Sequence, residues 1–188
     1  MDLRSWIGAD LTSLKTRLEG GVLSVIPLER RTERVDGGGI APIYVLWHTA
    51  RHQDVAINRV LAGTSEVVDE WTDRLGVEDD LWRGLAEAED VDMVDLLDPA
   101  AVDGYALAVI DRTSAWLADA DLSTMDDVAE TDQPLQALGA PEDRFDWLYN
   151  MWRGKPRSFF LSWEAVGHGY NHLGELISIR NRMGLSPF

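Results

Sequence analysis

The sequence of 188 residues contains no cysteine. This absence excludes a disulfide framework, a thiolate metal site and a nucleophilic thiol within the protein. Any metal ion bound by the chain must therefore take nitrogen or oxygen ligands.

Positive charge and long apolar runs are also scarce. Basic residues number 17 against 33 acidic ones, and the net charge of −16 makes the surface repel phosphate backbones and anionic lipids. No stretch approaches the roughly 18 continuous apolar residues of a membrane span, and the first residues lack the pattern of a signal peptide. We therefore expect a soluble, cytoplasmic protein without a nucleic-acid or membrane partner.

The residues that are present predict a single helical domain. Hydrophobic residues make up 45% of the chain and include eight tryptophans, so residues 1–188 can bury a substantial core as one domain. Apolar residues recur at helical spacing, and no stretch shows the two-residue alternation of a half-buried strand. Long helices are expected over residues 3–18, 42–61, 99–120 and 158–183.

The helix ends are predicted from local signals. Gly20-Gly21 should end the first helix, whereas Asp98-Pro99 should start the third by capping free amides and presetting the first turn. Residues 27–39 combine charges with three glycines and are expected to form an exposed connection. The expected fold is an all-α four-helix bundle with long connections after the second and third helices.

The four histidines form two copies of one spacing. His48 and His52 lie in WHTARHQD, and His168 and His172 lie in VGHGYNHLGE. Residues four apart on a helix stand on the same side, so each pair can share one small ligand. His168 and His172 also belong to the apolar stripe of the last helix, where an unpartnered polar ring costs about 1 to 3 kcal/mol. Hydrogen bonds to neighbours explain one such ring, but two pairs in register favour a metal ion.

The residue after the first histidine excludes one familiar metalloenzyme. In HExxH zinc proteases that position is the catalytic glutamate, whereas here it is Gly169. Glu175 lies one turn past His172 and has two interpretations: it orients a ligand histidine, or it pairs with Arg51 or Arg180.

Other polar and aromatic residues near the histidines receive no catalytic role. Arg51 has two interpretations: it binds an anionic substrate, or, as the favoured alternative, it forms an ion pair on the acidic surface. Asp54 also has two interpretations: it orients a ligand histidine, or it pairs with Arg51. Packing is the favoured role for three aromatic residues that could otherwise serve the pocket: Tyr44, Trp152 and Trp163.

Two of the helices have apolar residues on more than one side. The helix over 42–61 and the last helix therefore pack against more than their bundle neighbours. An insertion would cover the second side, and a homodimer would do so equally well.

With the helices placed, WHTARHQD and WEAVGHGYNHLGELISIRNRMG resemble the DinB-like (YfiT-like) superfamily of metal-binding four-helix bundles. The resemblance implies a metal ion held by His48, His168 and His172, with open positions for water or substrate and no place for His52. Three imidazoles without a thiolate suit zinc, nickel, iron or copper, and the family makes zinc or nickel the expected ion.

The resemblance also implies a function. Members of the superfamily include mycothiol-dependent maleylpyruvate isomerase and bacillithiol S-transferases, so we expect a metal-dependent transferase that activates a low-molecular-weight thiol, such as mycothiol, for attack on a small-molecule electrophile. The isomerase type has glutamate at the position of His168, which argues against that activity itself. A metal-dependent hydrolase and a non-enzymatic metal- or ligand-binding bundle are the alternatives.

Overall fold

The computed structural model describes residues 2–77, 83–87 and 90–187. Regular structure in these residues is helical, and the β-type pairing they contain is an isolated bridge between Val128 and Pro156. The all-α prediction is therefore confirmed. No helix in this part of the chain combines the length and the apolar character needed to cross a membrane.

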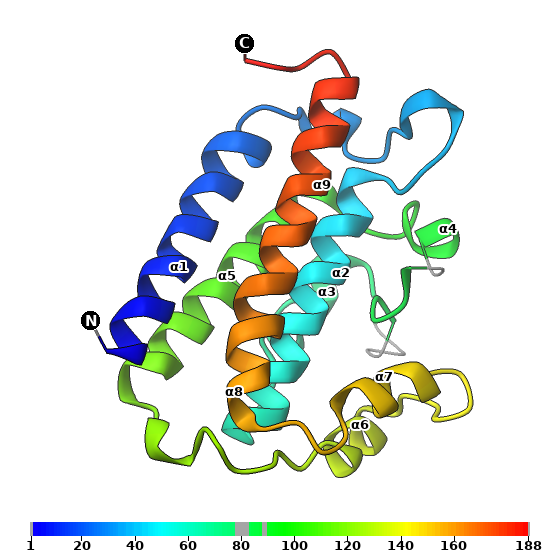
Figure 1. Ribbon diagram of the computed structural model, residues 1–188. Coiled ribbons are helices and arrows are strands. Elements are labelled where there is room, and N and C mark those ends of the chain that lie inside the picture. The colour runs from blue at the N-terminus through cyan, green and yellow to red at the C-terminus, as the bar shows by residue number, and fades with distance from the viewer. Residues whose placement is uncertain (1, 78–82, 88–89, 188) are drawn as a thin grey trace.

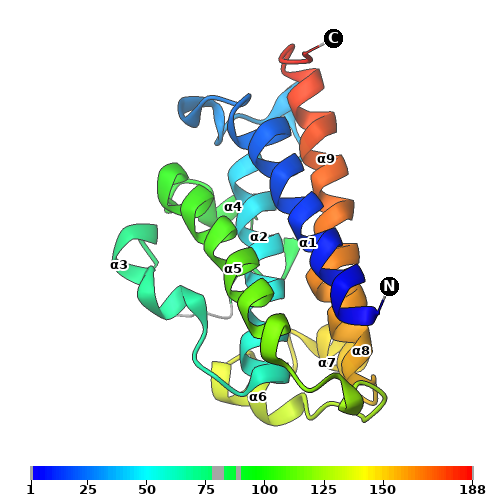
Figure 2. The same cartoon turned by 90° about the vertical axis from the view of Figure 1, so that its left-hand side faces the viewer.

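Four long helical segments lie side by side (Figures 1 and 2). The first is α1 (Leu3–Leu18), and the third is α5 (Pro99–Asp119). The second consists of α2 (Pro42–Asp54) and a π-helical continuation, η4 (Val55–Ala62). The fourth runs through α8 (Arg157–Phe159), the π-helical η8 (Phe160–Gly167) and α9 (His168–Arg182). The second segment contacts both α5 and the fourth segment, while α1 covers α5 and η8.

Short helices fill the connections. Two of them, α3 (Thr72–Leu75) and α4 (Asp90–Met93), lie between the second and third long segments. Two more, α6 (Asp132–Leu138) and α7 (Asp146–Trp152), lie near the end of the molecule that holds α8 (Figure 1). Shorter 3₁₀ turns occur at Leu28–Arg30, Val35–Gly37, Val67–Glu70 and Leu122–Thr124.

The start signals predicted for the second and third long helices are found at the observed helix starts. The Asp98 carboxylate accepts a hydrogen bond from the Ala101 amide at 2.8 Å, and proline follows it in the first turn of α5. Pro42 likewise occupies the first turn of α2. Because these signals act locally, they fix the beginnings of the long helices to within a residue or two of their predicted positions.

One local prediction is wrong, and another holds only in part. Gly20-Gly21 does not stop the first helix, which continues as a π-helical turn over Glu19–Leu23; Val22 is fully buried there, and the Gly21 carbonyl accepts from Arg180 Nη1 at 2.6 Å. The connection 27–39 is not exposed throughout, because the Arg31 side chain is fully buried and pairs with Asp103 at 2.9 Å. Long-range contacts override the local signals at both places.

The π-helical segments were not predicted, since a strict 100° periodicity assumes an α-helix. Two of them stand next to the histidines: η4 begins directly after Asp54, and η8 ends at Gly167, directly before His168. The two segments pack against each other. Such π-helical insertions in helices occur frequently at functional sites.

Candidate metal centre

The fold brings all four histidines together in the interior. Their side chains come from α2 and α9, and each residue is at most 8% exposed. Ring centroids lie 5.2 Å apart for His48 and His168, 5.0 Å for His48 and His172, and 4.5 Å for His168 and His172. One ligand atom from each of these three rings lies within 4.8 Å of the others. The structure therefore assembles the predicted triad, while metal binding itself stays a prediction.

Two of these rings are held in the orientation of metal ligands. His48 Nδ1 lies 2.6 Å from the carbonyl oxygen of Gly84, and His172 Nδ1 lies 2.9 Å from a carboxylate oxygen of Glu175. Because a carbonyl or carboxylate oxygen accepts, each Nδ1 carries the proton and each Nε2 keeps its lone pair. A metal-binding histidine has the same arrangement. Glu175 thus orients a candidate ligand, as one of its two interpretations predicts.

His168 has a buried ring nitrogen that makes no hydrogen bond within the described part of the chain. Its Nε2 lies 2.9 Å from His172 Nε2, whereas its buried Nδ1 makes no hydrogen bond. Metal–nitrogen bonds of about 2.0 to 2.1 Å in a tetrahedral site place two ligand nitrogens about 3.3 Å apart. The spacing of these nitrogens therefore fits a zinc-sized ion after small rotations of the rings.

Burial also keeps two of the rings uncharged. It lowers the pKa of His48 well below its usual value, and repulsion from His52 and His172 lowers that pKa further. Burial is likewise the largest cause of the lowered pKa of His168, with the other three histidines adding to it. Neutral imidazole is the form that binds a metal ion, so these two rings are ready to bind near neutral pH.

Acidification below about pH 6.5 is expected to destabilise the metal-free chain through His168. The unfolded residue gains a proton near its ordinary pKa of about 6.5, whereas the buried residue gains it only at much lower pH. Between these values the unfolded chain binds the extra proton, so the free energy of unfolding falls by about 1.4 kcal/mol per pH unit. Urea denaturation of the metal-free protein between about pH 6.5 and 5 measures this slope.

The matched comparison for this slope is His168→Gln, which removes the titrating ring and should have a shallower pH dependence by about that amount. Asp103 acts in the opposite direction, because burial raises its pKa to about 6 although Arg31 lowers it, but this effect is the same in both proteins. Equal slopes for the two proteins would contradict the prediction.

A second group of possible ligands, which includes Glu164, was missed in the sequence. Glu164 is fully buried on η8, and its Oε2 lies 3.2 Å from His52 Nδ1 and 3.9 Å from His168 Nδ1. Trp152 Nε1 donates to the other carboxylate oxygen at 2.7 Å. Glu164 stands four residues before His168, the same spacing that joins the histidines, so the signal was present. His52, placed outside the triad, lies beside it.

A cavity of about 410 Å³ opens beside the histidines, and His48, His52 and His168 form part of its wall. The rest of the described wall is mainly apolar and consists of Leu85, Ala86, Glu87, Trp147, Met151 and Trp163. No lysine or arginine is among the described residues of this wall, so they suit an uncharged, apolar group. Trp163 lines the cavity, whereas Trp152 is fully buried, is not among the described wall residues and donates a hydrogen bond to Glu164.

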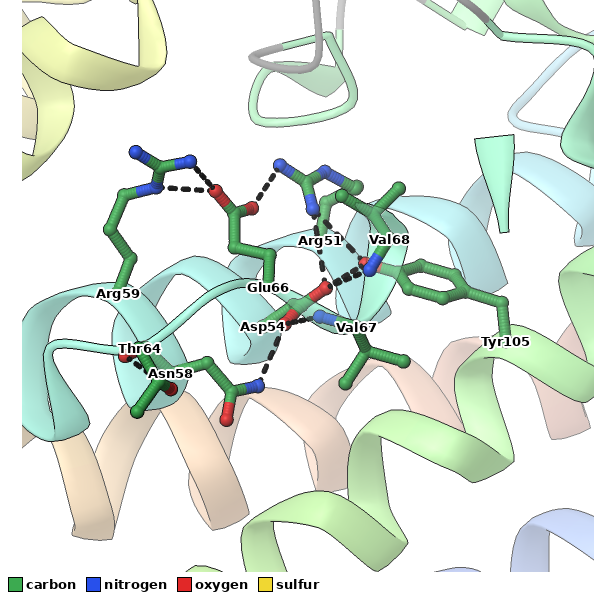
Figure 3. A network of polar contacts seen from close by, with 9 residues as sticks. All are labelled: Arg51, Asp54, Asn58, Arg59, Thr64, Glu66, Val67, Val68 and Tyr105. Atoms are coloured by element: carbon green, nitrogen blue, oxygen red, sulfur yellow. Dashed lines mark hydrogen bonds and ion pairs between the residues drawn. The ribbon is translucent and has the colours of Figure 1, made fainter. Parts of the chain in front are cut away.

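Arg51 is not at the surface, contrary to the favoured prediction. Its side chain is fully buried and pairs with Glu66 at 2.7 Å and with Asp54 at 3.4 Å (Figure 3). Burial by itself lowers the pKa of Arg51, but Tyr105 and the two carboxylates raise this pKa by a larger amount. The net shift is therefore upward, and the guanidinium stays charged. Arg51 is also not among the residues that line the cavity. Its role here is internal, and Asp54 serves Arg51 rather than a histidine.

Residues 84–87 cover the second side of α2. Tyr44 donates its hydroxyl hydrogen to the carbonyl of Ala86, and His52 Nε2 lies 2.9 Å from the carbonyl of Leu85. The two-sided burial of α2 is therefore explained by an insertion within the chain. A homodimer stays an untested prediction.

No family model matches the sequence, and no curated protein matches it.

Proposed function

We propose that this chain is a metal-dependent enzyme of the DinB-like type, in which a divalent transition metal, zinc or nickel, serves the transfer of a low-molecular-weight thiol to a small electrophile. The observation that carries the proposal is the convergence of His48, His168 and His172, two of which, His48 and His168, line a mainly apolar cavity. The order of the four long segments, with long connections after the second and third, supports the DinB-like assignment.

The protein groups have distinct roles in this proposal. The Nε2 atoms of the three histidines would hold the ion, while Gly84 and Glu175 fix the rings of His48 and His172 by accepting from Nδ1. Such an ion is a Lewis acid that lowers the pKa of a bound thiol or water. Trp147 and Trp163 would pack against an apolar electrophile in the cavity. Since the chain has no cysteine, the thiol must come from a cofactor or substrate.

Turnover is expected to require both the ion and the thiol. The full chain, freed of metal by a chelator and reloaded with zinc or nickel, is assayed with mycothiol or bacillithiol against epoxides and activated aryl halides. His48→Gln should reduce turnover by at least about a hundredfold, because it removes a ligand, and the exposed Asn171→Ala on α9 should leave it unchanged.

Other results of this assay distinguish the alternatives. Turnover of esters, amides or phosphates without thiol identifies a hydrolase, and tight metal binding without turnover identifies a non-catalytic binding protein. A chain that takes up neither zinc nor nickel excludes the proposal altogether.

A further inference from the structure

Glu164 is a buried carboxylate that forms no ion pair with a lysine or arginine among the described residues. The residue is fully buried, and its described contacts are Trp152, His52 and His168. A buried anion is costly unless a positive charge compensates it. Trp152 satisfies only Oε1, so Oε2 is left facing the two histidines.

In its neutral form, His52 presents an acceptor atom to this carboxylate. Its Nε2 lies 2.9 Å from the carbonyl of Leu85, which accepts only, so Nε2 carries the proton and the neutral ring has a lone pair on Nδ1. That lone pair lies 3.2 Å from Glu164 Oε2, which is itself an acceptor. Two acceptors this close in a buried place require a positive species between them.

His168 supplies a third donor atom at the same place. Its buried Nδ1 has no hydrogen-bond partner among the residues that the structure describes, and it lies 3.9 Å from the same carboxylate oxygen. One ligand atom from each of His52, Glu164 and His168 lies within 4.8 Å of the other two. Two imidazole nitrogens and one carboxylate oxygen form a donor set typical of zinc and similar ions.

We propose that His52 Nδ1, Glu164 Oε2 and His168 Nδ1 hold a second divalent cation, and that the ring of His168 bridges it to the ion of the His48 triad. The second position stands on its own donor atoms, but the bridge rests on the proposed function, since it requires the first ion. With both positions filled, His168 uses both ring nitrogens and releases its single ring proton to solvent. The outer contacts match this use, because Leu85 and Trp152 orient His52 and Glu164 as Gly84 orients His48.

Metal stoichiometry tests this proposal. The chelator-stripped full chain is titrated with Zn²⁺ and weighed by native mass spectrometry, and two bound ions are expected. Glu164→Gln and His52→Gln should each bind one, because each loses a ligand of the second position only. Glu87→Gln, which removes an exposed carboxylate from the cavity wall, is the matched control and should still bind two. Circular dichroism verifies that each variant is folded.

The possible failures are separable. One ion in the unmodified chain and one in Glu164→Gln overturns the second position and leaves the first intact, with a proton in place of the second cation. No bound ion in the unmodified chain overturns the proposed function as well.

Copper tests the bridge. Two Cu²⁺ ions joined by an imidazolate couple magnetically. The intensity of the electron paramagnetic resonance signal of the fully loaded chain should therefore be well below the intensity expected for the same amount of uncoupled copper. Glu164→Gln should restore the full signal per copper. Two coppers with full signal in the unmodified chain would overturn the bridging role of His168.

Discussion

Replacing Asp54 with alanine is expected to lower the free energy of unfolding by about 3 to 5 kcal/mol. Asp54 is fully buried, and its carboxylate accepts hydrogen bonds from Tyr105 at 2.7 Å and from the amides of Val67 and Val68 at 2.9 Å each (Figure 3). It also pairs with Arg51. Its removal leaves several buried donors unsatisfied at once and deprives a buried guanidinium of one of its counterions. Urea denaturation of the metal-free protein measures the loss.

Asp111→Ala is the matched control for this loss. Asp111 is exposed and pairs with Lys15 at 2.6 Å, so its removal should cost no more than about 1 kcal/mol. If the two variants lose similar stability, the buried network contributes no more than a surface ion pair. Such a result would refute the role given to it here.

The polar network around Arg51 and Asp54 also helps to position the candidate metal centre. Gly84, whose carbonyl accepts from His48, packs against Trp47 and Arg51: a β-carbon at Gly84 would lie 2.3 Å from Trp47 Nε1 and 3.0 Å from Arg51 Cγ. Gly84 also has a φ of 98°, which favours glycine. The position of Arg51 therefore determines where the carbonyl that orients His48 can lie, and Asp54 determines the position of Arg51.

The sequence predicted the parts of the molecule that depend on local signals and periodicity. The helix class, the start of α5 at Asp98-Pro99 and the shared side of His168 and His172 follow from short stretches of chain. The meeting of these two histidines with His48 across two helices was implied by the family resemblance, and the structure places the three rings together.

The features that the sequence did not predict depend on contacts between distant segments. Arg51 was expected at the surface because acidic residues abound there, but burial by Glu66 and Tyr105 cannot be deduced from spacing. The hydrogen bonds to the carbonyls of Gly84 and Leu85 could not be predicted either, because every residue has a backbone carbonyl and the sequence does not mark which one a histidine meets. Glu164 is a different case, because its four-residue spacing from His168 is visible in the sequence. Only its complete burial in the structure shows that this spacing places a carboxylate beside the histidines.

Replacing His168 with alanine is expected to lower the affinity for zinc by about a hundred- to a thousandfold. Structural zinc sites bind with about 10 to 16 kcal/mol shared among four ligands, so one ligand contributes about 2.5 to 4 kcal/mol, and each 1.4 kcal/mol is tenfold. The loss applies at the triad and at the second position alike, because His168 belongs to both candidate ligand groups. Competition with a chromophoric chelator measures the affinity.

Two further variants on α9 separate this effect from a general disturbance of the helix. Glu175→Gln weakens the acceptor of His172 Nδ1 without removing a ligand, so affinity at the triad should fall only about 10- to 100-fold. The exposed Asn171→Ala should leave it unchanged. The metal-free His168→Ala protein should remain folded, because the ring it loses contains a buried nitrogen without a hydrogen-bond partner. A folded His168→Ala protein with unchanged zinc affinity would show that the ion binds elsewhere, and the convergence of the imidazoles would then have a structural origin alone.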